Sequence, residues 1–226
     1  PYGMVPFTPS YFSKRSGFVI NQLSGGGCEH MCNFPTFPVK SKLKMSPDNI
    51  LNYRINISEE KGHAGYYEAM VQEDIKAKLT VTERTGMASY EYPADQQYGT
   101  VIIGGGISAT PIEQAAIVIT APNKCEGYAE GGNFCGLRTP YKVYFVAEFD
   151  ADALESGTWK RDELKPNTTF AEGEYSGVYF TFDVSKKKNV QYKIGVSYVS
   201  VENARENLKA ENTGWDFLQI QNQAES

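Results

Sequence analysis

Apolar and polar residues alternate with a period of two over long stretches of the chain after residue 53, and this alternation limits the possible folds more than any other feature. In a β-strand, successive side chains point to opposite faces, so such a stretch buries one face and exposes the other. The clearest segments are Tyr53, Ile55 and Ile57; Ala77, Leu79 and Val81; Val143, Phe145, Ala147 and Phe149; and Val190, Tyr192, Ile194, Val196 and Tyr198. The sequence therefore predicts strands at these places.

Weaker strand signals lie between these segments, and turn-forming residues separate them. The weaker candidates are residues 65–71, 87–92, 100–103, 115–120 and 177–182. The chain contains 21 Gly and 11 Pro, and its aromatic fraction of 13% suits strands joined by turns. About nine or ten short strands with few intervening helices are typical of a sandwich. We therefore expect an all-β fold with minor α content, a supersandwich-like antiparallel β-sandwich.

The last part of the chain has a helical pattern instead. Ser200 is suited to an N-cap, and apolar residues follow it at helical spacing as far as Leu208. A second short stretch, residues 216–225, carries a narrow apolar stripe. We therefore divide the chain into a β-sandwich domain, residues 1–199, and a helical linker, residues 200–226.

The charge balance and the hydropathy argue against two classes of partner. Lys and Arg total 22 and Asp and Glu total 27, which leaves a net charge of −5 at pH 7 and no dense basic run. Nucleic acids and anionic membranes attract strongly basic surfaces, so we expect neither as the main partner. No apolar stretch approaches the roughly 20 residues that a membrane-spanning helix needs, so we expect no membrane insertion.

The four cysteines leave their pairing open. Cys125 and Cys135 flank a glycine-rich segment, and a disulfide across a hairpin between them is one of two open alternatives, the other being free thiols. Cys28 and Cys32 lie too close in sequence for an easy bridge. Together with His30 they form a cluster of soft ligands, but zinc normally takes four ligands, and the sequence has no second close pair. A structured loop with a buried or free thiol is the favoured interpretation.

No complete catalytic set can be assembled from the sequence, so we assign no catalytic residue. The chain has only two histidines, and no nucleophile-elbow motif surrounds a serine. The run from Gly104 to Ala109 fits the spacing of a dinucleotide fingerprint, yet the β-branched residues after it leave no room for the helix that such a site needs. Trp159 and Trp215 are candidates for stacking on sugar rings, although a tryptophan is more often a core or interface anchor.

A set of short motifs runs in one order from residue 1 to about residue 217. The opening Pro1-Tyr2-Gly3-Met4-Val5 is followed by Gly17-Phe18 and then by Leu23-Ser24-Gly25-Gly26-Gly27-Cys28. The further blocks are residues 65–67, 75–79, 82–86, 144–149, 199–208 and 214–217. Each block is weak alone, but the ordered set resembles the N-terminal domain of glycoside hydrolase family 92, the bacterial exo-acting α-mannosidases.

The resemblance implies a β-sandwich that packs on a larger C-terminal (α/α) barrel of the same polypeptide. In that family the catalytic acid, the base and a calcium ion belong mostly to the barrel, while the sandwich supplies loops to the cleft. We therefore expect no cofactor in this chain, calcium in the full-length parent, and a secreted or periplasmic bacterial protein.

The glycine-rich loop is the candidate substrate-binding site. Consecutive glycines let backbone amides approach a ligand closely, and a glutamate accepts hydrogen bonds from sugar hydroxyls. The residues of this site are Ser24, Gly25, Gly26, Gly27, Cys28 and Glu29.

The sequence leaves more than one functional hypothesis. The preferred one is a substrate-contacting and scaffolding domain, inactive by itself, of an α-mannosidase-like glycoside hydrolase that removes terminal mannose from glycans. The alternative is a stand-alone carbohydrate-binding or adhesion sandwich without catalysis, and a purely structural scaffold is a third. We also expect an exposed apolar surface where the barrel would pack, through which the chain can dimerise.

Overall fold

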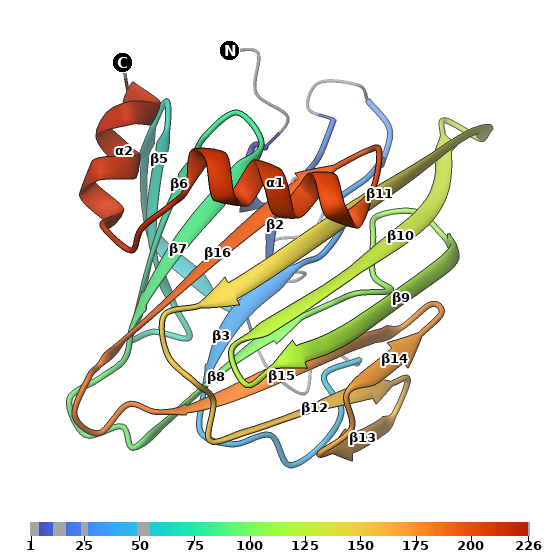
Figure 1. The fold of residues 1–226 in the computed structure, drawn as a ribbon. Coiled ribbons are helices and arrows are strands. Elements are labelled where there is room, and N and C mark those ends of the chain that lie inside the picture. Colours follow the sequence, from blue (N-terminus) through green and yellow to red (C-terminus); the bar gives the residue numbers. More distant parts are fainter. Residues whose placement is uncertain (1–4, 11–16, 24–26, 49–54, 226) are drawn as a thin grey trace.

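The computed structural model describes residues 5–10, 17–23, 27–48 and 55–225, which form two β-sheets packed face to face (Figure 1). The first sheet has seven strands in the order β1-β2-β3-β8-β15-β12-β13. These strands are β1 (Thr8–Pro9), β2 (Phe18–Val19), β3 (Thr36–Lys40), β8 (Tyr98–Ile103), β12 (Glu155–Lys160), β13 (Glu163–Pro166) and β15 (Ser176–Asp183).

The second sheet has nine strands in the order β14-β9-β10-β11-β16-β7-β6-β5-β4. These strands are β4 (Ile57–His63), β5 (Tyr66–Val71), β6 (Ile75–Val81), β7 (Thr85–Glu91), β9 (Ile112–Ala121), β10 (Lys124–Phe134), β11 (Leu137–Phe149), β14 (Phe170–Glu172) and β16 (Asn189–Ser197). Neighbouring strands pair antiparallel in both sheets, as in β10 with β11 and β8 with β15. The predicted all-β antiparallel sandwich is confirmed.

Aromatic side chains from both sheets fill the interior. The ring of Phe149 on β11 lies 4.8 Å, centroid to centroid, from Phe180 on β15 of the other sheet, and 5.3 Å from Tyr192 on β16. Trp159 on β12 is only 1% exposed. Burying such large apolar surfaces is the main favourable term in folding, which explains why the alternating segment that contains Phe149 faces inward.

Two helices follow the last strand. Helix α1 (Val201–Glu211) begins after Ser200, whose Oγ accepts a hydrogen bond from the backbone N–H of Asn203 at 3.1 Å, so the predicted N-cap is confirmed. The helix lies across the outer face of the nine-stranded sheet (Figure 1), where Ala204 and Leu208 pack on Val146 of β11. Helix α2 (Phe217–Glu225) lies beside β5 and β6 (Figure 1). Neither helix is long and apolar enough to cross a membrane.

The described residues contain 16 strands, more than the alternation alone predicts. The main omission is β10, whose inward positions are small residues such as Gly127 and Ala129 instead of large apolar ones. A Cβ atom at Gly127 would lie 2.2 Å from the carbonyl oxygen of Ala116, so the neighbouring strand excludes a larger residue. The expected strand that starts at Tyr53 lies partly outside the described residues, and β4 begins only at Ile57.

Candidate functional site

The glycine-rich loop projects from the sandwich, and two short backbone contacts close its base. Gln22 and Met31 form an antiparallel bridge, and the N–H of Cys32 donates to the carbonyl of Asn21 at 2.9 Å. Ser24, Gly25 and Gly26 of the predicted site lie outside the described residues. The described part of the loop is exposed at Gly27 and Glu29, so the carboxylate of Glu29 is accessible to a ligand.

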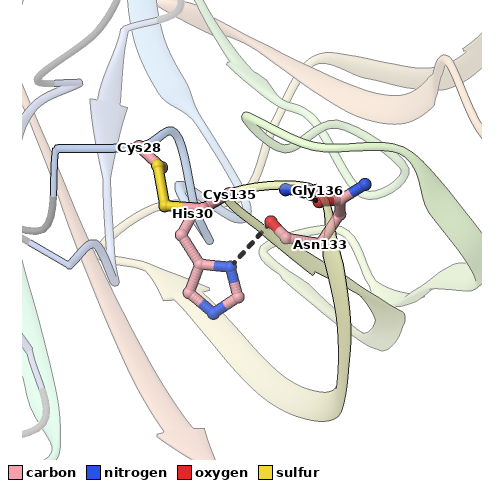
Figure 2. Close-up of a disulfide and its surroundings, with 5 residues drawn as sticks. All are labelled: Cys28, His30, Asn133, Cys135 and Gly136. Atoms are coloured by element: carbon pink, nitrogen blue, oxygen red, sulfur yellow. Dashed lines mark hydrogen bonds between the residues drawn. A yellow bond between two sulfur atoms is a disulfide. The ribbon is translucent and has the colours of Figure 1, made fainter.

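A disulfide between Cys28 and Cys135 ties this loop to the turn between β10 and β11 (Figure 2). The two Cα atoms are 5.4 Å apart, although 107 positions separate the residues in sequence. The predicted pairing of Cys125 with Cys135 is therefore wrong. These two residues lie near opposite ends of β10, about 33 Å apart at the rise of an extended strand.

Cys125 instead points into the core as a free thiol. Burial raises the pKa of this thiol, which keeps it protonated and unreactive. Cys32, which is also outside the disulfide, is buried as well. The expectation of a structured loop with a buried thiol thus holds for Cys32, whereas Cys28 is oxidised.

His30 is a packing residue that joins the loop to the same hairpin. Its Nδ1 lies 3.2 Å from the carbonyl oxygen of Asn133 (Figure 2), and its ring meets Phe134 and Tyr141 edge to face at centroid distances of 5.4 and 5.5 Å. Because Cys28 is in a disulfide, it cannot offer a thiolate to a metal. Among the described residues, no group of three His, Cys, Asp or Glu side chains is placed to hold a metal ion.

A buried polar network lies beneath the loop. The Oδ1 of Asn33 accepts hydrogen bonds from the hydroxyl of Tyr141 at 2.7 Å and from the amide of Asn21 at 3.1 Å. The same Asn21 amide reaches the hydroxyl of Tyr198 at 3.2 Å. Burial raises the pKa of Tyr141, so its hydroxyl stays a neutral donor. The network holds the base of the loop rigid and provides no group that gains or loses a proton near neutral pH.

A groove of about 770 Å³ lies next to the loop and shares Gln22 with it. Its other walls are residues 5–6, the turn between β4 and β5, the turn between β6 and β7, the end of α1 with the segment that joins it to α2, and α2 itself. Within it, Arg84 and Glu211 form an ion pair, and the Glu211 carboxylate also accepts a hydrogen bond from the hydroxyl of Thr82 at 2.6 Å. Sequence reasoning missed this groove because its walls come from segments that are far apart in the chain.

The remaining sequence candidates have structural roles. Gly104 to Gly106 are buried in the connection that leads from β8 towards β9, and no helix follows them, so the nucleotide interpretation stays rejected. Trp159 belongs to the core. Trp215 covers Lys193, whose Nζ lies 4.4 Å from the centre of the indole ring. Trp159 is thus not an open platform for a sugar.

The two packed antiparallel sheets define a β-sandwich domain, and the bond between Cys28 and Cys135 anchors a surface loop to it. Comparison of the sequence with known families identifies the family. The chain belongs to the family described as the glycosyl hydrolase family 92 N-terminal domain, whose sequence model matches residues 1–197. The suspected resemblance is confirmed.

Individual relatives agree with this assignment. A protein of Arthroderma benhamiae described as an uncharacterized secreted glycosidase is 25% identical over 240 residues, which cover 95% of this chain and 31% of that protein. An alpha-mannosidase of family GH92 from Bacteroides thetaiotaomicron has the same fold, with a TM-score of 0.80 at 22% identity over 93% of this chain and 30% of that one. An inverting mannosidase of the same family and organism gives 0.73 at 22% identity over 85% and 25%. The chain thus spans about a third or less of the length of these relatives.

Proposed function

We propose that this chain is the substrate-contacting and scaffolding N-terminal domain of an α-mannosidase-like glycoside hydrolase that removes terminal mannose from glycans. The match of the family model to residues 1–197 carries this proposal. Two solved proteins with the same fold are described as mannosidases of the same family, which supports mannose as the sugar.

In this proposal the chemistry takes place mostly on a further C-terminal domain. Hydrolysis with inversion needs a general acid and a separate base that activates water. The described residues offer no group of metal ligands, and the relatives are more than three times as long as this chain. We therefore assign the acid, the base and a calcium ion to the additional length. This chain holds no cofactor of its own in the proposal.

The glycine-rich loop would form one edge of the cleft. Backbone amides of residues 24–27 can approach a sugar closely, because no Cβ atom intervenes at its three glycines. The exposed carboxylate of Glu29 would accept hydrogen bonds from sugar hydroxyls. The bond between Cys28 and Cys135 supports this role, because a loop held in place loses less conformational entropy when it binds a ligand.

The same disulfide supports a secreted or periplasmic location. Disulfides form and persist in oxidising compartments and are rare in the reducing cytosol. The Arthroderma relative is described as secreted, which agrees with such a compartment.

Hydrolysis of an aryl α-mannoside tests the division of labour. We expect no turnover by residues 1–226 alone, and calcium-dependent turnover by the longer polypeptide encoded by the same reading frame. Robust turnover by residues 1–226 would contradict the division. A reading frame that ends without a further domain would favour the stand-alone carbohydrate-binding sandwich.

In the longer polypeptide, Glu29→Gln should weaken mannoside binding and leave the unfolding midpoint unchanged.

A further inference from the structure

The outer face of the nine-stranded sheet carries a pair of adjacent tyrosines that are not part of the glycine-rich loop. Tyr128 on β10 lies directly opposite Tyr144 on β11, and their ring centroids are 6.1 Å apart. On the other side of Tyr128, the opposite residue on β9 is the small Ala116. Both tyrosines are partly exposed. Helix α1 lies to one side, helix α2 lies over β5 and β6, and in the described part of the chain Figure 1 shows no further element over β9 and β10.

Polar groups border the tyrosines along the strands. Glu130 and Lys142 are the next outward pair on β10 and β11, with the Lys142 Nζ 3.2 Å from the carboxylate. The same Nζ lies 4.1 Å from the ring centre of Tyr128. On the opposite side, Glu126 pairs with Arg205 of α1 at 2.7 Å. Hydrogen-bond donors and acceptors thus lie on both sides of the aromatic pair.

This combination of groups selects for one class of ligand. Each bordering carboxylate is paired with a cation, so the surface as a whole attracts neither a polyanion nor a polycation. A hexose ring has an apolar C–H face that stacks on an aromatic ring, and a rim of hydroxyls that both donate and accept hydrogen bonds. The stretch from Glu126 to Glu130 is about 13 Å long at the rise of a strand, which is more than one sugar ring needs.

We propose that Tyr128 and Tyr144 form a platform that binds neutral hexose units of a glycan chain. The flexible stem of Lys142 lets its ammonium move from the Tyr128 ring to a sugar hydroxyl, which frees the ring face for the sugar. Tyr128 precedes Cys135 by seven positions, a distance of about 23 Å along an extended strand, so the platform is separate from the disulfide-anchored loop. The proposal takes glycan as the ligand class from the proposed function and adds a second, non-catalytic contact with it.

Affinity electrophoresis of the 226-residue chain tests the platform, with mannan, xylan or mixed-linkage β-glucan cast into the gel. We expect mannan to retard the wild type, and the double variant Tyr128→Thr, Tyr144→Thr to weaken this binding by about tenfold, the effect of losing two stacking contacts. Threonine keeps the β-propensity of both positions. The variant Tyr128→Phe, Tyr144→Phe keeps both rings and should bind much as the wild type does.

Tyr98→Thr is the matched control. Tyr98 is also a partly exposed strand tyrosine with a lysine over its ring, since the Nζ of Lys42 lies 5.0 Å from the ring centre, but it belongs to the other sheet. This control should leave retardation unchanged. The proposal fails if none of the three polysaccharides retards the wild type, if the double Thr variant binds as the wild type does, or if Tyr98→Thr weakens binding equally.

The test separates the platform from the proposed function. Retardation by β-glucan that depends on the two tyrosines, without retardation by mannan, would support the platform and contradict mannose as its sugar. Retardation by xylan alone would contradict a site for hexose units. Loss of the platform effect while the longer polypeptide still hydrolyses a small aryl mannoside would overturn the platform and leave the proposed function in place. Urea unfolding of every variant verifies that it is folded. If the Thr pair is destabilised, the single variants Tyr128→Thr and Tyr144→Thr supply the comparison, and each should weaken binding by about threefold.

Discussion

Removal of the bond between Cys28 and Cys135 should destabilise the whole domain. The bond closes a loop of 107 residues in the unfolded chain. The chain-entropy relation gives about 4.8 kcal/mol for a loop of this length at 25 °C, and native disulfides of small secreted domains are worth about 2–5 kcal/mol when removed. We therefore expect the double variant Cys28→Ser, Cys135→Ser to lose about 2–5 kcal/mol of unfolding free energy.

Urea unfolding under non-reducing conditions, followed by fluorescence, measures this loss. Both cysteines lie at least partly at the surface, so serine at these positions adds little burial penalty of its own. A reductant should lower the stability of the wild type towards that of the double variant and leave the double variant unchanged. Titration of thiols in denaturant should find two in the unreduced wild type, Cys32 and Cys125, and all four after reduction.

Two results would refute this reasoning. Equal unfolding free energies of the wild type and the double variant would show that the bond does not restrict the unfolded chain. Four reactive thiols in the unreduced, denatured protein would show that the bond does not form at all. The second result would also remove the structural support for a secreted or periplasmic location.

Two further substitutions test the packing and the helix cap. Gly177→Ala should cost about 3 kcal/mol or more, because its Cβ would lie 2.2 Å from a ring carbon of Trp159 inside the core. Urea unfolding measures the cost, and wild-type stability would contradict the packing described. Ser200→Ala should cost about 1 kcal/mol through loss of the hydrogen bond from the N–H of Asn203, whereas Ser200→Asp should retain the cap. Thermal unfolding compares the two, and equal melting temperatures would exclude a role for the cap.

The parts of the fold that were predicted correctly are those whose signal lies in neighbouring residues. The strand through Val143 and Phe149 was predicted because every second residue is apolar, and the helix after Ser200 because a capping residue precedes a helical apolar spacing. The strand that contains Gly127 was missed, because small inward residues give no apolar signal. That omission also produced the wrong disulfide, since a strand interpreted as a loop allows its two ends to meet.

The sequence predicted the candidate substrate-binding site as a loop, but it did not predict the contacts that hold this loop in place. Its glycine run and Glu29 are visible in the sequence, and the resemblance to the family drew attention to them. The partner of Cys28 and the packing of His30 against the β10–β11 hairpin were not visible, because they depend on residues about a hundred positions away. The sugar-stacking role considered for Trp159 failed for the same reason, since burial is decided by what packs around a side chain.

The sequence by itself determined that the chain forms antiparallel strands followed by a capped helix, and its ordered motifs determined the family. These properties depend on residues close together in the chain, whose side chains alternate in direction whatever lies beyond them. Only the tertiary structure decided which strands are neighbours, which cysteine binds Cys28, and that Tyr128 and Tyr144 lie side by side on an open face. Such contacts depend on the pairing of strands through backbone hydrogen bonds and on the burial of apolar faces between the two sheets, neither of which is visible in neighbouring residues of the sequence.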